Sequence, residues 1–140
     1  MILKDRVDAF QELSKFLSNP HYQSSFYPTV KKAMQNNSWF TEQNIKFSFS
    51  ALAHMLNYLP LWLKSYNILD EKKKIGVIIA SNIPLVGFYD FLCVLISGNI
   101  FIGKLSSSNN VLLPYVANLL CSINSDFNNY IYFKNDIKNV

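Results

Sequence analysis

Glycine is scarce in this chain of 140 residues. The four glycines stand far apart, at Gly76, Gly87, Gly98 and Gly103. A G-x-G-x-x-G dinucleotide fingerprint and a Walker loop both need glycines clustered where the backbone approaches phosphate. The sequence therefore excludes both kinds of glycine-rich phosphate loop.

Histidine and cysteine are also scarce, with two of each. His21 and His54 have no second metal-binding residue at a ligand spacing, so we predict no metal site. Cys93 and Cys121 lie far apart on apolar stretches, and neither has the local His or Asp signature of a nucleophile. We interpret them as reduced thiols buried in the core, which is typical of a cytoplasmic protein.

Long hydrophobic runs are missing too. The window 91–103 is too short to span a membrane, and it contains a helix-ending Gly-Asn pair. Extending it backward adds Asp90, Pro84 and Asn82, which are costly in lipid. The N-terminus has no small-residue cleavage site, so the sequence indicates neither a membrane span nor a secretory signal.

Charge is modest, with a formal net charge of +4 and scattered Lys and Arg residues. The one cluster, Lys72–Lys74, follows Asp70 and Glu71, and we interpret it as a solvated linker rather than a nucleic-acid site. Half of the residues are hydrophobic. A chain of this length and composition is expected to form a real hydrophobic core.

The stretch 74–107 is the most apolar part and has the pattern of a βαβ unit. Ile75–Ala80 is rich in β-branched residues, which is typical of a buried strand. Leu85–Ser97 predicts a helix that is apolar nearly all round, and Gly98 suits its end. Ile100–Gly103 predicts a second strand. The two strands are expected to be parallel, with a right-handed crossover.

Polar residues follow each of these strands. Ser81 and Asn82 are good helix-start residues, and Pro84 suits a helix's first turn. Lys104 stands at the end of the second strand. Ligands of open α/β sheets bind outside the carboxyl ends of the strands, which is where Asn82 and Lys104 are expected. The alternative is that Asn82 is only a helix cap and Lys104 only a solvated strand end.

The remaining segments are predicted to be mainly helical. An amphipathic helix is expected over residues 1–18, a loop over 21–28 and a short helix over 29–36. Thr41 is the expected N-cap of a longer helix, with Phe40 and Ile45 as its hydrophobic staple.

Three further features complete the prediction. Residues 60–66 predict one more short helix, and Trp39 and Trp62 are expected to be core or interface anchors. Asn109 and Asn110 are expected to cap a helix that carries an apolar stripe and has Pro114 in its first turn. That stripe consists of Leu112, Leu113, Val116, Leu119, Leu120 and Ile123. Residues 130–133 predict a third strand.

Two motifs carry a family resemblance. Asn82-Ile83-Pro84-Leu85, followed by an apolar helix, a Gly-Asn pair and Lys104, resembles the cofactor-binding core of the aldehyde dehydrogenase superfamily. That superfamily has Asn-x-Pro after one strand and Lys-Pro-x-Glu after the next. More narrowly, SNIPLVGFYDFLCVLISGN and NNSWFTEQNI resemble LuxC-like acyl-CoA reductases.

The resemblance implies an α/β fold. We expect a helical N-terminal arm at 1–70 and, at 71–140, a truncated cofactor-binding domain. The second part would be an incomplete Rossmann-like β-α-β-α-β half-domain of aldehyde dehydrogenase type. Such a half-sheet should leave an unpaired edge and an exposed apolar face.

The resemblance also implies site residues. Asn82 matches the Asn whose amide stabilises the oxyanion of a thiohemiacetal, and Lys104 matches the Lys that contacts the adenosine ribose of the cofactor. Leu105 replaces the family's Pro, and Ser106 and Ser107 complete the expected cofactor-binding set. Ser107 stands in place of the Glu that would repel a 2′-phosphate, which favours NADPH over NADH.

The nucleophilic Cys of the family lies in a later domain, and no residue here matches it. The resemblance thus implies the N-terminal part of an NADPH-dependent acyl-CoA reductase, which forms fatty aldehyde through a Cys thioester and is catalytically incomplete in this chain. The alternative is a non-catalytic interaction or regulatory module. A third possibility, a relative acting on a phosphorylated acyl group, is disfavoured by NNSWFTEQNI. The expected partners are an acyl-CoA or acyl-carrier thioester and no nucleic acid; a homo-oligomer or an acyl-donating protein stays open.

Overall fold

The structure, a computed structural model, describes residues 1–65 and 71–140. Its N-terminal part consists of helices α1 (Leu3–Ser18), α2 (Phe26–Asn36), α3 (Glu42–Asn57) and α4 (Leu59–Leu63), with the short 3-10 helix η1 (Pro20–Tyr22). Its C-terminal part consists of β1 (Lys74–Ile78), α5 (Phe88–Ile96), β2 (Ile100–Lys104), α6 (Leu112–Ile123), the 3-10 helix η2 (Ser125–Asn129) and β3 (Ile131–Phe133). The fold is α/β, as predicted.

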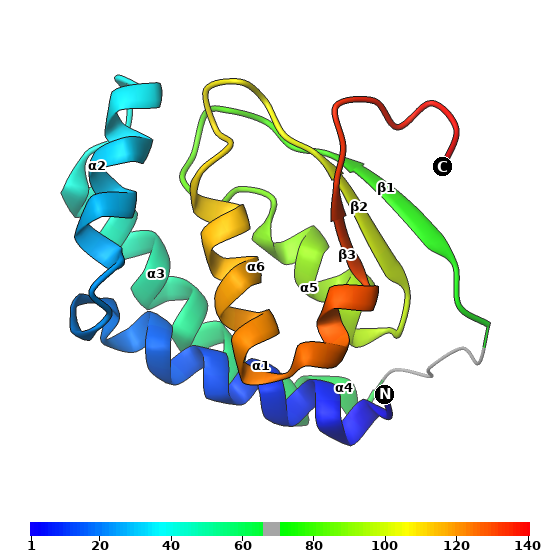
Figure 1. Cartoon of the computed structure of the whole chain (residues 1–140). Coiled ribbons are helices and arrows are strands. Elements are labelled where there is room, and N and C mark those ends of the chain that lie inside the picture. Colours follow the sequence, from blue (N-terminus) through cyan, green and yellow to red (C-terminus); the bar gives the residue numbers. More distant parts are fainter. Residues whose placement is uncertain (66–70) are drawn as a thin grey trace.

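The strands form one parallel sheet in the order β1-β2-β3 within the described residues (Figure 1). Lys74 pairs with Ile100 at one end of the β1–β2 ladder, and Ile78 pairs with Lys104 at the other. Phe101 pairs with Ile131 in the β2–β3 ladder. The predicted parallel βαβ unit and the third strand are confirmed.

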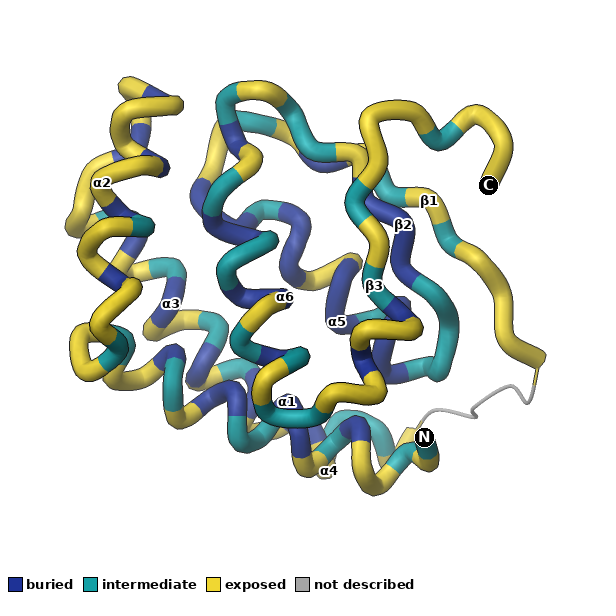
Figure 2. The backbone as a smooth tube through the Cα atoms, viewed as in Figure 1, coloured by how far each residue is buried: buried dark blue, intermediate teal, exposed yellow. Residues whose placement is uncertain are grey.

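An aromatic chain connects the sheet to the N-terminal helices. Phe101 on β2 meets the ring of Phe91 on α5 edge-on, with 5.1 Å between ring centroids. Phe10 on α1 lies 6.4 Å from Phe91 and 5.8 Å from Phe127 in η2. All four rings are fully buried, and the buried positions of α1, α5 and α6 face one another (Figure 2).

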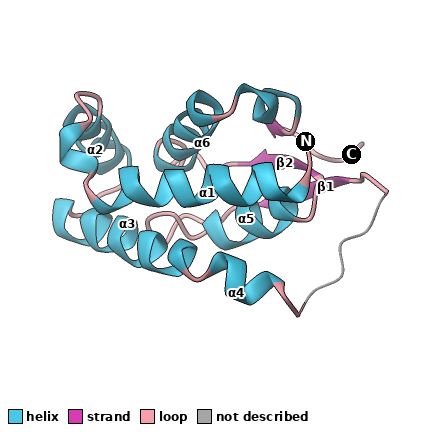
Figure 3. Ribbon diagram, turned by 90° about the horizontal axis from the view of Figure 1, so that it is seen from below, coloured by secondary structure: helices cyan, strands magenta, loops and turns pink. Residues whose placement is uncertain are grey.

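The helical part and the sheet therefore share one hydrophobic core. Helix α1 runs along the molecule and packs on α3 as well as on α5 and α6 (Figure 3). The predicted division between residues 1–70 and 71–140 falls at residues 66–70, which lie outside the described part. Tyr66, the last residue of the predicted helix 60–66, also lies outside it. That division stays a prediction.

Arg6 makes a polar link inside this core. Its side chain is buried, with Nε donating to the Ile96 carbonyl at 3.1 Å and Nη1 donating to the Met1 carbonyl at 2.7 Å. Ile96 is the last residue of α5, where carbonyls lack intrahelical donors. A cation from α1 thus satisfies the negative end of α5.

Helix α5 ends as predicted at a glycine. Gly98 has φ +86°, a conformation that glycine adopts without steric cost. Its N–H donates to the Leu95 carbonyl at 3.0 Å, and the Asn99 N–H donates to the Val94 carbonyl at 3.1 Å. This pair of bonds is a Schellman motif.

The start of α3 is also confirmed. Thr41 Oγ1 accepts from the Asn44 N–H at 3.1 Å, and Asn44 Oδ1 accepts from the Thr41 N–H at 2.8 Å. Phe40 and Ile45 are both buried at the two staple positions. The reciprocal bonds form a capping box.

The start of α5 differs from the prediction. The helix begins at Phe88 rather than Leu85, because Leu85 has φ +58° in the left-handed region. Pro84 accordingly lies in the preceding loop and not in a first helical turn. The loop returns closely to the sheet: a Cβ on Gly87 would lie 2.9 Å from Ile79 Cγ1.

Two smaller predictions are also wrong, and a third loses one of its alternatives. Helix α2 begins at Phe26, inside the predicted loop, because Phe26 packs on Phe49 of α3 with 5.4 Å between ring centroids. Trp39, expected to be a core or an interface anchor, is 77% exposed, so the core role is excluded and the interface role stays a prediction. Cys93 and Cys121 are half-buried rather than buried.

One face of the sheet packs on the core, and the other is only partly covered. Ile102 is 3% exposed on that second face, and Ile137 lies near it, over Gly76. Ile78, on the edge strand β1, is 75% exposed. The expected unpaired edge is present in the described part, whereas the C-terminal residues cover a portion of the expected apolar face. No described helix is long and apolar enough to cross a membrane.

Candidate functional site

The carboxyl ends of β1 and β2 lie side by side. Ile78 pairs with Lys104, and the next N–H, that of Ile79, donates to the Lys104 carbonyl at 3.0 Å. The loops 79–87 and 105–111 therefore leave the sheet at the same edge (Figure 1). Asn82 lies in the first loop and Lys104 begins the second, so the structure brings the two predicted regions together.

Asn109 joins these two loops. Its side chain is 6% exposed, and Nδ2 donates to the Ala80 carbonyl at 2.9 Å and to the Ile83 carbonyl at 3.4 Å. Helix α6 begins only at Leu112 and has no side-chain cap. The prediction that Asn109 caps this helix is wrong, because its amide serves the loop around Asn82 instead.

Asn37 reaches the same loop from the helical part. This residue, in the turn between α2 and α3, is 8% exposed. Its Nδ2 donates to the Ser81 carbonyl at 2.8 Å, and its Oδ1 accepts from the Trp39 N–H at 3.0 Å. This hydrogen bond connects the α2–α3 turn to the loop after β1, at the carboxyl edge of the sheet.

Asn82 itself is exposed at this edge. Helix α5 has Gly87 as its N-cap and no side-chain cap bond. The alternative that Asn82 is a helix cap is therefore wrong. Its carboxamide, with two N–H donors, enters none of the hydrogen bonds found among the described residues, so these donors are available to a ligand.

The residues after β2 offer a cation and hydroxyl groups. Lys104 and Ser107 are exposed. The Oγ of Ser106 is buried without a hydrogen-bond partner in residues 1–65 and 71–140. Ser106 and Asn109 form an isolated antiparallel bridge, with the Asn109 N–H donating to the Ser106 carbonyl at 3.2 Å. An exposed ammonium group and an exposed hydroxyl close together in the chain, with the unsatisfied Ser106 between them, fit a ligand rich in hydroxyl or phosphate oxygens.

Burial disfavours the thiolate form of both cysteines. Burial raises the thiol pKa of Cys93, which lies in α5, and the nearby Asp90 raises it further, although a bond with Tyr89 acts in the opposite direction. Burial also raises the pKa of Cys121, in α6. A raised pKa lowers the thiolate fraction, and the thiolate is the reactive form. No group of three or more His, Cys, Asp or Glu residues in the described part could hold a metal ion.

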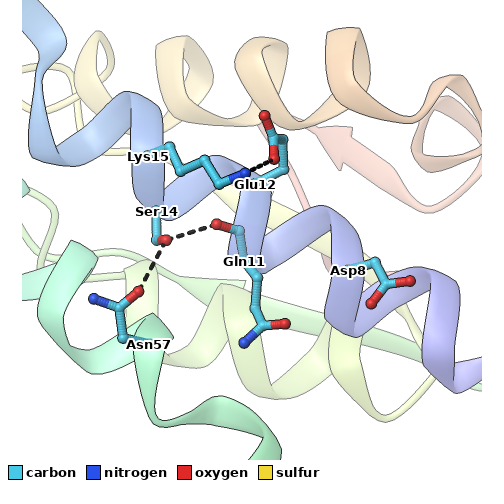
Figure 4. Close-up of a pocket in the computed structure, with 6 residues that line it drawn as sticks. All are labelled: Asp8, Gln11, Glu12, Ser14, Lys15 and Asn57. Carbon is cyan, nitrogen blue, oxygen red and sulfur yellow. Dashed lines mark hydrogen bonds and ion pairs between the residues drawn. The ribbon is translucent and has the colours of Figure 1, made fainter.

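A shallow pocket on the helical part has a different character. Its lining consists of Asp8, Gln11, Glu12, Ser14, Lys15 and Asn57 (Figure 4). Ser14 donates to the Gln11 carbonyl at 2.6 Å and to Asn57 Oδ1 at 3.2 Å. Lys15 and Glu12 pair at 2.7 Å. Ser14, Lys15 and Glu12 thus have partners within the lining, and Asp8 pairs with Lys4. This pocket contains none of the predicted site residues.

The sequence reasoning missed Asn37 and Asn109 as parts of the site. Their partners are 44 and 29 residues away along the chain. A local pattern contains no sign of such contacts. The abundance of Asn at both turns was visible, but helix ends also favour Asn.

Comparison with known families matches residues 3–136 to the family described as Acyl-CoA reductase (LuxC). No curated protein and no solved structure matches the chain. The family match covers the helices and the sheet alike, including the loops that hold Asn82 and Lys104. This chain belongs to the acyl-CoA reductase (LuxC) family.

Proposed function

We propose that this chain is the N-terminal, cofactor-binding part of an NADPH-dependent acyl-CoA reductase. The single observation that supports the proposal most is the placement of Asn82 and Lys104 at one carboxyl edge of a parallel sheet, in a chain of this family. Ligands of open α/β sheets bind at that edge. The substrate would be an acyl-CoA or an acyl-carrier thioester.

Lys104, Ser106 and Ser107 would hold the adenosine ribose and the 2′-phosphate of NADPH. Bound there, the cofactor would supply hydride. A lysine ammonium gives a charge-assisted hydrogen bond to a phosphate oxygen, and serine hydroxyls donate further bonds. Ser107 is neutral, so nothing at its position repels a 2′-phosphate, and this favours NADPH over NADH.

Asn82 would stabilise the oxyanion that forms when a thiolate attacks the thioester carbonyl. An amide N–H directed at that developing charge lowers the barrier by about 3 to 4 kcal/mol. The thiolate itself would come from outside this chain, because neither cysteine matches the nucleophilic Cys that the resemblance implies, and burial raises the pKa values of Cys93 and Cys121. We therefore infer that the chain alone is catalytically incomplete.

The second candidate function is a non-catalytic interaction module. The exposed edge strand β1, with Ile78 75% exposed, favours this alternative. An unpaired edge offers backbone donors and acceptors to another chain. Such a module would need no cofactor, so cofactor binding separates the two candidates.

The test compares the affinities for NADPH and NADH by calorimetric titration. Lys104→Ala should weaken NADPH binding by one to two decades and NADH binding much less, because a bond to a charged phosphate contributes about 1.5 to 3 kcal/mol. Ser107→Glu should shift the preference toward NADH. Lys74→Ala, an exposed lysine at the opposite end of β1, is the matched control.

The control should bind both cofactors as the wild type does. If neither Lys104→Ala nor Ser107→Glu changed the ratio of the two affinities, the proposed ribose and phosphate site would be wrong. Absence of binding of either cofactor at millimolar concentration would favour the interaction module.

A further inference from the structure

We propose that Asn37 and Asn109 are positioning residues that hold the turn of residues 80–83 and thereby fix where Asn82 presents its carboxamide. The inference rests on the proposed oxyanion role of Asn82. It adds two side chains, one from the helical part and one from the loop after β2, that no local motif indicates.

Asn109 closes the turn. Its single Nδ2 atom donates to the carbonyls of Ala80 and Ile83, at 2.9 and 3.4 Å. These two carbonyls are three residues apart in the chain, yet both accept from the same nitrogen. Ser81 and Asn82 lie between them and form the tip of the turn. Because Asn109 is only 6% exposed, water cannot readily replace these bonds.

Asn37 fixes the tip itself. Its Nδ2 donates to the Ser81 carbonyl at 2.8 Å, directly before Asn82. Its Oδ1 accepts from the Trp39 backbone N–H at 3.0 Å, so the side-chain amide is oriented with Nδ2 toward Ser81. The carbonyls of Ala80, Ser81 and Ile83 thus all accept hydrogen bonds from buried side chains, while Asn82 remains exposed.

The turn needs this support. It lies outside any helix or strand, and its chain continues into Leu85, whose φ of +58° is one that side chains rarely adopt. An oxyanion donor is effective only if it is already in place when the charge develops. Support by buried neighbours is the usual means of placing such a group.

The test uses 15N relaxation of the 140-residue chain. Asn37→Asp and Asn109→Asp keep Oδ1 and the side-chain volume but remove the Nδ2 donors. Asn36→Asp is the matched control, because Asn36 Nδ2 donates at 2.7 Å to Asn110 Oδ1 and to none of the carbonyls of the turn. The readout is the order parameter of the Asn82 backbone N–H, measured well below the melting temperature.

We expect a value of about 0.85 in the wild type and in Asn36→Asp, and below about 0.6 in the double variant of Asn37 and Asn109. The order parameters along β2 should stay unchanged, which a general loss of stability would not give. If the aspartate variants do not fold, the neutral Asn37→Ser and Asn109→Ser variants remove the same donors. A rigid Asn82 in the double variant would overturn the inference.

This outcome is separate from that of the proposed function. If the chain binds neither NADPH nor NADH, the proposed function fails, while the order parameters still decide the role of the two asparagines. If Asn82 stays rigid in the double variant, the positioning role fails, while the effect of Lys104→Ala on NADPH still decides the cofactor site.

Discussion

Replacing Arg6 by methionine should destabilise the whole fold, although Arg6 lies far in sequence from helix α5, whose end it supports. The guanidinium is buried and donates to the carbonyls of Ile96 and Met1. Burial lowers the pKa of this guanidinium, so the fold retains the charge against a desolvation cost. The two hydrogen bonds must offset that cost.

The magnitude follows from the contacts. Each hydrogen bond to a charged group contributes about 1.5 to 3 kcal/mol net, and methionine retains most of the apolar stem. The lower value for the two bonds together is about 3 kcal/mol, which we expect Arg6→Met to lose. Arg6→Ala should lose about 5 kcal/mol, since it also removes stem methylenes that contribute about 0.8 kcal/mol each.

The assay is urea unfolding followed by circular dichroism. Lys4→Met, on the same helix and exposed, is the matched control and should leave the midpoint nearly unchanged. If Arg6→Met were as stable as the wild type, the argument that α1 stabilises the end of α5 would be refuted. A lower midpoint in the control would instead indicate a general effect of removing a cation.

Four further outcomes are expected. Thr41→Ala should cost about 1 kcal/mol of stability, because the Asn44 N–H loses its acceptor; an unchanged urea midpoint would contradict this. The wild type should self-associate in light scattering through its open edge strand, and Ile78→Lys should reduce this association; a monodisperse wild-type monomer would argue against an adhesive edge. Because burial raises both thiol pKa values, iodoacetamide should label Cys93 and Cys121 more slowly than free cysteine at pH 8, with rates that rise as the pH increases. The purified chain should not oxidise NADPH in response to an acyl-CoA, and clear turnover would show that one of these thiols is a nucleophile after all.

Much of the fold was predictable because its signals are local. The β-branched runs, the cap at Thr41 and the glycine at the end of α5 each act through neighbouring residues. The pairing of β1 with β2 follows from the short apolar helix between them, which leaves room only for a parallel return. These features depend little on the rest of the chain.

The missed features depend on contacts between distant segments. Leu85 has the sequence context of the first residue of an apolar helix, yet its φ is positive and the helix begins only at Phe88. Asn109 resembled a helix cap, and its amide instead bonds to a loop that precedes it by more than twenty residues. Composition and periodicity contain no information on such bonds. The edge of the sheet could therefore be predicted as the site, but not the side chains that shape it.

A nicotinamide dinucleotide is proposed to bind at the carboxyl edge of β1 and β2. The most direct measurement is an NMR titration of the chain with NADPH, which also detects millimolar binding. We predict that the shifted amide signals cluster in residues 79–87 and 104–109, and that Lys104→Ala removes most of the shifts. Signals that move only on the helical part, or not at all at saturating NADPH, would contradict the claim.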